Sequence, residues 1–191
     1  MKKRLLSLAV VLICVSILTG GTFAYFSTDD TAHNVITTHK VDVEIIEQKL
    51  KNGSLVDFGN DKIQVMPGIK VSKIVSVKNN EATSWIRMKY EVTMFDADGN
   101  IKDVSAELME DLVIIEPDIQ NWTEKDGWWY YRNPVKTGET TSPVFEAVAF
   151  SGPEMRNEYQ NCTIKINIIA QAVQKDNNRG GVLEAGGWPE E

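Results

Sequence analysis

Alternation of apolar and polar residues with a period of two is the feature that most constrains this chain. Val41, Val43 and Ile45 alternate with acidic residues, and Ile164, Ile166 and Ile168 alternate with polar ones. The longest run, Trp85 to Met94, places Ile86, Met88, Tyr90 and Val92 on one face. Successive side chains of a strand point to opposite faces, so this pattern predicts half-buried β-strands.

Shorter runs extend the same pattern along the chain. They are residues 71–77, Leu112–Ile115, Trp128–Tyr131 and Val144–Phe150. We expect Trp128–Tyr131 to pair with Val144–Phe150 across the turn residues 133–139. Val104–Asp111 is the one segment with helical character. Seven or eight short strands at turn-punctuated intervals predict an all-β, antiparallel sandwich or barrel with short helical or loop insertions.

The N-terminus has the layout of an export signal. Lys2, Lys3 and Arg4 precede an apolar run, Leu5–Leu18, and residues 19–24, which are small apart from Phe23, follow. The run is shorter than the ~20 residues that span a bilayer as a helix. We therefore predict a signal peptide over residues 1–24, cleaved between Ala24 and Tyr25. An uncleaved N-terminal anchor is the alternative.

Removal of this signal changes the charge and the cysteine count. The whole chain has 191 residues with 20 basic and 27 acidic side chains, and the signal holds three of the basic ones and none of the acidic ones. The mature chain therefore carries a net charge of −10, which argues against nucleic acid as a partner. Cys162 is then the single cysteine, so no intramolecular disulfide can form and a packed core must supply the stability.

Candidate chemical sites are sparse. His33 and His39 lie six residues apart among acidic residues, but the two-histidine helix motif of zinc proteases is absent. Cys162 opens a predicted strand, which favours a buried structural thiol over a nucleophile. Asp96–Asn100 resembles part of a calcium loop but lacks its final glutamate, so we expect a plain turn. We predict no catalytic, cofactor or metal-ligating residue.

An aromatic group and the chain ends complete the predicted organisation. In a sandwich about half of the aromatic group faces the core, and the rest can form a sugar-binding or subunit interface. Its members are Trp122, Trp128, Trp129, Tyr130 and Tyr131. We expect a mobile N-terminal segment over residues 25–40, a sandwich domain over 41–175 and a flexible, Gly-rich tail over 176–191.

Three stretches resemble a known family. The junction Gly20–Asp29 (GGTFAYFSTD) looks like the processing site of proteins cut by the specialised signal peptidase SipW. Met66–Lys73 followed by Val77–Glu81 is similar to that family's Pro-Gly, strand and Asn-rich turn, and Trp85–Met88 follows where the family has its next strand. The C-terminal patches 127–131, 141–145 and 170–174 resemble the shorter clostridial-type members, such as BsaA. The family is that of the TasA and camelysin-like biofilm matrix proteins of Gram-positive bacteria.

The resemblance implies a jelly-roll-like β-sandwich that is secreted and assembles into an extracellular fibre. In TasA-type fibres the mature N-terminus adds as a strand to the next subunit, which is β-augmentation. The candidate donor-strand residues here are Tyr25, Phe26, Val35, Ile36, Thr37 and Thr38. The implied partners are further copies of the chain in a head-to-tail polymer, other matrix or cell-wall components, and a SipW-type signal peptidase.

Three alternatives stay open at this point. Residues 25–40 can instead pair within their own subunit. The camelysin side of the family implies a cell-surface metalloendopeptidase, but the chain offers only two histidines as zinc ligands. A monomeric accessory protein that anchors or caps fibres is the third. For the fibre we also expect acid to favour assembly, because protonation of carboxylates reduces the repulsion between subunits of net charge −10.

Overall fold

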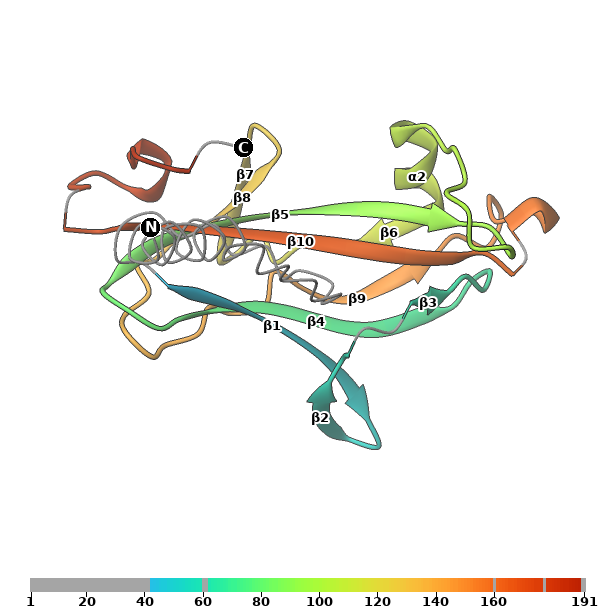
Figure 1. Ribbon diagram of the computed structural model, residues 1–191, viewed down its shortest axis with the longest axis horizontal. Coiled ribbons are helices and arrows are strands. Elements are labelled where there is room, and N and C mark those ends of the chain that lie inside the picture. The colour runs from blue at the N-terminus through green and yellow to red at the C-terminus, as the bar shows by residue number, and fades with distance from the viewer. Residues whose placement is uncertain (1–41, 60–61, 160, 177, 190–191) are drawn as a thin grey trace, which may run out of the picture. The chain divides into compact units, whose positions relative to one another are not determined.

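The computed structural model describes residues 42–59, 62–159, 161–176 and 178–189. Within them two antiparallel sheets of five strands each pack face to face (Figure 1). The strand order is β2-β1-β4-β9-β6 in the first sheet and β3-β10-β5-β8-β7 in the second. The prediction of an all-β antiparallel sandwich is thus confirmed.

The elements have the following bounds. The first sheet contains β1 (Val43–Lys51), β2 (Ser54–Asp57), β4 (Lys70–Asn79), β6 (Val113–Ile115) and β9 (Phe145–Phe150). The second contains β3 (Ile63–Gln64), β5 (Ser84–Phe95), β7 (Trp122–Lys125), β8 (Trp128–Tyr131) and β10 (Thr163–Gln174). One α-helix, α2 (Ala106–Leu112), and two short 3₁₀ helices, η1 (Asn157–Tyr159) and η2 (Val182–Glu184), are also described.

The core lies between the sheets, where the sequence alternation places it. β5 and β10 pair along their whole length, from Ser84 with Gln174 to Phe95 with Thr163. Several of their inward residues, among them Ile86, Met88 and Ile164, are fully buried. They meet the inward face of the first sheet, where Val75 and Val148 are also fully buried. Alternating burial on these long strands fixes the register, because a slip of one residue would turn every apolar side chain outward.

Helix α2 forms where the sequence predicts helical character. The Ser105 hydroxyl accepts a hydrogen bond from the backbone amide of Leu108, which caps the first turn, and Glu107 in that turn suits the positive end of the helix dipole. The helix ends as the chain enters the β-branched run of β6. None of the helices within the described ranges has the length and hydropathy to span a bilayer.

The predicted pairing of Trp128–Tyr131 with Val144–Phe150 is wrong. β9 lies in the first sheet and pairs with β4 and β6, whereas β8 lies in the second and pairs with β7 and β5. The reason is that both edges of β8 are used, one by β5 and the other by β7 through the turn at Asp126 and Gly127, whose φ angles are 54° and 77°. Two consecutive positive φ angles make a type I′ turn, which connects β8 to the strand before it.

The C-terminal segment adds a second apolar cluster on the outer face of the second sheet. Val182 is buried there with Trp85 and Val173, and Trp188 packs edge-to-face on Tyr130 at 5.7 Å between ring centroids. The prediction of a flexible tail from residue 176 did not include this packing. Val182 and Trp188 of this segment are held in contact with the second sheet.

Candidate functional site

One stretch of β5 has a single neighbouring strand among the residues that the structure describes. β8 pairs with β5 at Arg87 and Met88. Beyond that point, Tyr90–Thr93 is paired with β10 on one side, and within the described ranges no strand pairs with it on the other. An edge of this kind presents backbone N–H and C=O groups to an incoming strand.

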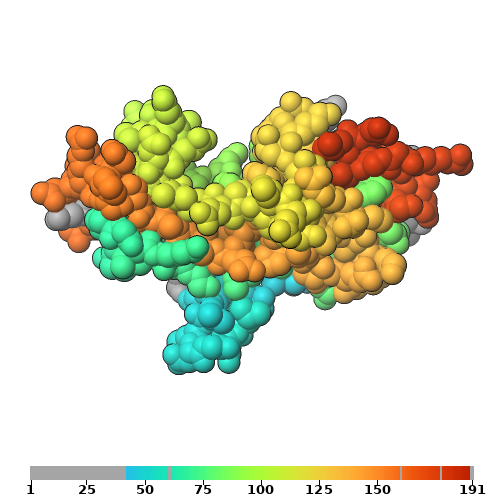
Figure 2. Space-filling view, turned by 180° about the vertical axis from the view of Figure 1, so that it is seen from behind, coloured from blue at the N-terminus to red at the C-terminus, as the bar shows by residue number. Residues whose placement is uncertain are grey.

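A groove of about 340 Å³ runs beside this edge. Its walls come from both sheets and from the helix between them, and Figure 2 shows the surface hollowed between α2 and the β7–β8 hairpin. The lining residues are Tyr90, Val92, Met109, Glu110, Val113, Ile114, Ile115, Pro117 and Trp129. All but Tyr90 and Glu110 are apolar or indole side chains, so the groove suits an apolar or β-branched occupant.

The Tyr90 side chain, which lines the groove, is held in place by packing against the opposite sheet. The Tyr90 ring meets Phe145 of the opposite sheet edge-to-face, with centroids 5.3 Å apart and planes at 77°. Burial raises the pKa of the Tyr90 phenol, and the negative charge of Glu110 raises it further. Tyr90 therefore stays neutral at physiological pH and acts as a positioned wall rather than as a base. Chemically, an open strand edge beside an apolar groove can accept an extended segment by β-augmentation.

A larger cavity, of about 610 Å³, lies over the first sheet and is bordered by Lys70, Glu116, Asp118 and Glu146. The Asp118 carboxylate accepts hydrogen bonds from the Asn121 side chain at 2.7 Å and from the Gln120 amide at 3.0 Å. These bonds lower the pKa of Asp118 and use its oxygens to close the turn before β7. The hydrogen bonds of Asp118 and its lowered pKa are therefore explained by its structural role in this turn.

The predicted cleavage and donor-strand residues lie outside the described residues. They are Ala24, Tyr25, Phe26, Val35, Ile36, Thr37 and Thr38, and His33 and His39 lie there as well. The signal peptide, the mobile segment over residues 25–40 and the domain bounds stay predictions.

The aromatic group is largely packed into the protein. Trp122 is fully buried in the main core, and Trp128 and Tyr130 are buried in the cluster under the C-terminal segment. Trp129 and Tyr131 are half-buried against the main core. Trp129 is the member that also lines the groove. An interface role for the group stays a prediction.

The other chemical candidates have structural roles. Cys162 is free and buried, and burial raises the pKa of its thiol. The Asp96 carboxylate accepts hydrogen bonds from the backbone amides of Asp98 and Asn100, which closes the expected turn. Across the described part of the chain, no three His, Cys, Asp or Glu side chains form a group that could hold a metal ion.

Two features were missed from the sequence. The β1–β2 hairpin turns at Asn52 and Gly53, with φ angles of 53° and 81°, and an Asn-Gly pair between two alternating segments is the usual signal for such a turn. Lys73, 3% exposed, forms a buried ion pair with Glu47 across β4 and β1. No sequence signal indicates that pair, because a lysine in an alternating strand normally faces solvent.

Comparison with known proteins gives one family. The family model described as camelysin metallo-endopeptidase matches residues 1–179. No curated protein and no solved structure matches the chain. The family match covers most of the chain, including the predicted export signal, and confirms the camelysin part of the resemblance, whereas SipW processing and the likeness to BsaA stay predictions. The chain belongs to the camelysin family.

Proposed function

We propose that the protein is a structural subunit of an extracellular matrix fibre. Family membership supports a cell-surface or matrix protein. In our proposal a SipW-type signal peptidase removes residues 1–24, and the freed segment Tyr25–Thr38 adds as a strand to the next subunit. A head-to-tail contact of this kind is heterologous and leaves an open end, so it builds a filament rather than a closed ring.

The observation that carries this proposal is the open β5 edge beside the apolar groove. Tyr90–Thr93 offers four residues of backbone for pairing, and the β-branched run Val35–Thr38 is four residues long. In an added strand every second side chain faces the groove, so Val35 with Thr37, or Ile36 with Thr38, would enter it. Main-chain hydrogen bonds would supply affinity, and side-chain contacts in the groove would supply specificity.

Cleavage then controls assembly. Before processing, the donor segment is joined to the apolar run Leu5–Leu18 and its amino end is blocked. After processing, the segment begins at Tyr25 and is free to enter a neighbouring groove. Secretion, SipW dependence and head-to-tail polymerisation are thus parts of one proposal.

Deletion of Tyr25–Thr38 tests it. The truncated chain should fold, since the described sandwich begins after this segment, and it should stay monomeric while the processed chain forms filaments in negative-stain microscopy. A tag must not precede Tyr25, because it would extend the free end. Normal filaments from the deletion variant would refute strand donation. A processed chain that stays monomeric but co-sediments with fibres of another subunit would favour the accessory role.

The family description itself favours a second candidate, a cell-surface metallo-endopeptidase. His33 and His39 are the only histidines of the chain and the first residues to test. A protease predicts casein cleavage that a chelator abolishes and that His33→Ala with His39→Ala also abolishes. Activity that survives both treatments would contradict a metal site built on these histidines.

A further inference from the structure

The β1–β2 hairpin carries an exposed leucine pair. Leu50 and Leu55 are direct cross-strand partners in an antiparallel ladder and are 57% and 54% exposed. Residues 49–56 also contain two lysines and no acidic residue. The hairpin projects from the sandwich in Figures 1 and 2, and we call residues 49–56 the arm. The two side-by-side leucines therefore form an exposed apolar patch on a projecting, basic hairpin.

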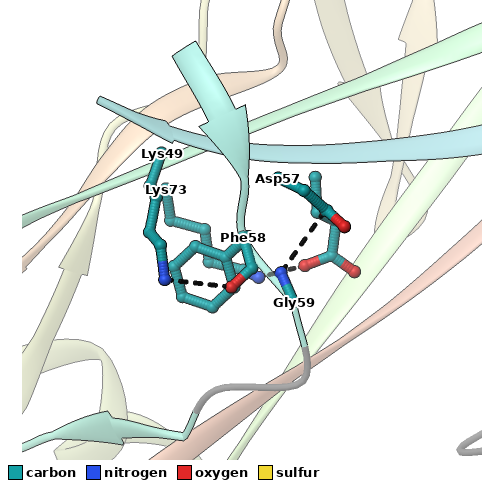
Figure 3. Close-up of polar contacts among 6 residues, drawn as sticks. Lys49, Asp57, Phe58, Gly59 and Lys73 are labelled. Atoms are coloured by element: carbon teal, nitrogen blue, oxygen red, sulfur yellow. Dashed lines mark hydrogen bonds and ion pairs between the residues drawn. The ribbon is translucent and has the colours of Figure 1, made fainter. Parts of the chain in front are cut away.

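The base of the arm is fixed. Phe58 follows β2, and the Lys73 ammonium lies over its ring, with Nζ 3.9 Å from the ring centroid. Lys73 also forms an ion pair with Glu47 of β1. Lys49 donates a hydrogen bond to the Phe58 carbonyl at 3.2 Å (Figure 3). The Leu50 amide donates to the Ser72 hydroxyl at 2.9 Å. A hairpin anchored in this way presents its leucines without a large ordering cost on binding.

A complementary surface lies on α2 and β6. Glu107, Glu110 and Asp111 give the helix three carboxylates and no basic residue. Leu108 on the helix and Ile114 on β6 are 37% and 42% exposed. This acidic surface with two apolar side chains matches the arm, which has two lysines and two leucines. In both views the arm and α2 project from opposite sides of the sandwich.

We propose that the arm of one copy of this chain docks on the α2–β6 surface of a second copy. The two surfaces differ and lie on opposite sides, so the contact is heterologous and repeats without closing. This inference rests on the proposed function, because it supplies a second contact between fibre subunits. The contact is small, so by itself it gives only weak self-association, and in a fibre it acts together with the donated strand, whose groove includes Glu110 and Ile114 of the same surface.

Charge reversal and its rescue test this docking. Lys51→Glu and the pair Glu107→Lys with Asp111→Lys should each raise the critical concentration for filaments about tenfold at low salt, and the combined variant should return it toward wild type. High salt should reduce each difference. Leu50→Ser with Leu55→Ser should weaken assembly regardless of salt. Lys165→Glu, at an exposed position on β10, is the matched control and should assemble normally.

The outcomes separate the inference from the proposed function. Filaments from the wild type with no effect of Lys51→Glu, or no rescue in the combined variant, would overturn the docking and leave strand donation standing. Should the wild type form no filaments, the proposed function fails. The same variants are then compared by sedimentation velocity at low salt. Weak self-association that Lys51→Glu removes and the combined variant restores supports the docking, and its absence overturns it.

Discussion

Removal of the Lys73 ammonium should destabilise the protein by more than any exposed charge does. The Lys73 and Glu47 side chains are 4% and 18% exposed, so Lys73→Met leaves a mostly covered carboxylate without its cation. Breaking a buried ion pair in this way costs about 3–5 kcal/mol, and the partial exposure of Glu47 favours the lower end. The ammonium also lies over the Phe58 ring, a contact worth about 1–2 kcal/mol. We therefore expect a loss of about 4 kcal/mol for Lys73→Met.

A double-mutant cycle separates the pair from its surroundings. Glu47→Leu alone leaves the ammonium unpaired in a site where burial already lowers its pKa, so it should cost about 2–4 kcal/mol. The double variant replaces both charges by apolar side chains and should cost about 1 kcal/mol, far less than the sum.

Urea unfolding of the processed chain and its three variants gives these free energies, provided that the slope against denaturant stays constant. Lys165→Glu serves as the exposed control and should shift the midpoint little. Two results would refute the claim that the Lys73–Glu47 ion pair stabilises the base of the arm. One is a cost under about 1 kcal/mol for each single variant, and the other is a double variant whose cost equals the sum of the two.

Three further predictions concern the C-terminal segment, the turn before β7 and the core thiol. Trp188→Ala should lower the unfolding free energy by about 1–3 kcal/mol, because it removes the edge-to-face contact with Tyr130, and a thermal melt measures it. Asp118 has a pKa below its usual 3.8, so its contribution to stability is present above that value and is lost as the pH falls through the folded pKa. Asp118→Asn should therefore flatten the acid side of the stability profile, and an unchanged profile would contradict this. Cys162 should resist iodoacetamide in the native protein and react after unfolding, and rapid native labelling followed by mass spectrometry would disagree.

The sequence predicted the fold class because long amphipathic strands carry their own signal. β5 and β10 each alternate over most of twelve residues, and apart from Ser84 and Gln171 their buried positions are apolar. The helix was predictable because Ser105 and Glu107 supply a cap and a favourable first turn. Such signals are local, so they can be recognised from the segment alone without knowledge of the rest of the chain.

The pairing of strands and the site were not predictable in the same way. β9 was assigned to the wrong sheet because proximity in the chain favoured a hairpin with β8, whereas the Asp126–Gly127 turn had already joined β8 to β7. The groove beside Tyr90 depends on where β8 stops pairing with β5, which no residue pattern in either strand shows. Lys73 looks like a surface lysine until the register brings Glu47 beside it.

Cross-linking between two different chains tests the central claim of strand donation most directly. One processed chain carries Ile36→Cys and the other Val92→Cys, both in a Cys162→Ser background, and neighbouring donor positions are scanned in the same way. Glu91→Cys, on the opposite face of β5, is the control. Strand donation predicts a disulfide-linked pair from the mixed chains with position 92 and not with position 91. A disulfide that forms only when both cysteines are in the same chain would contradict it and show that the segment pairs within its own subunit.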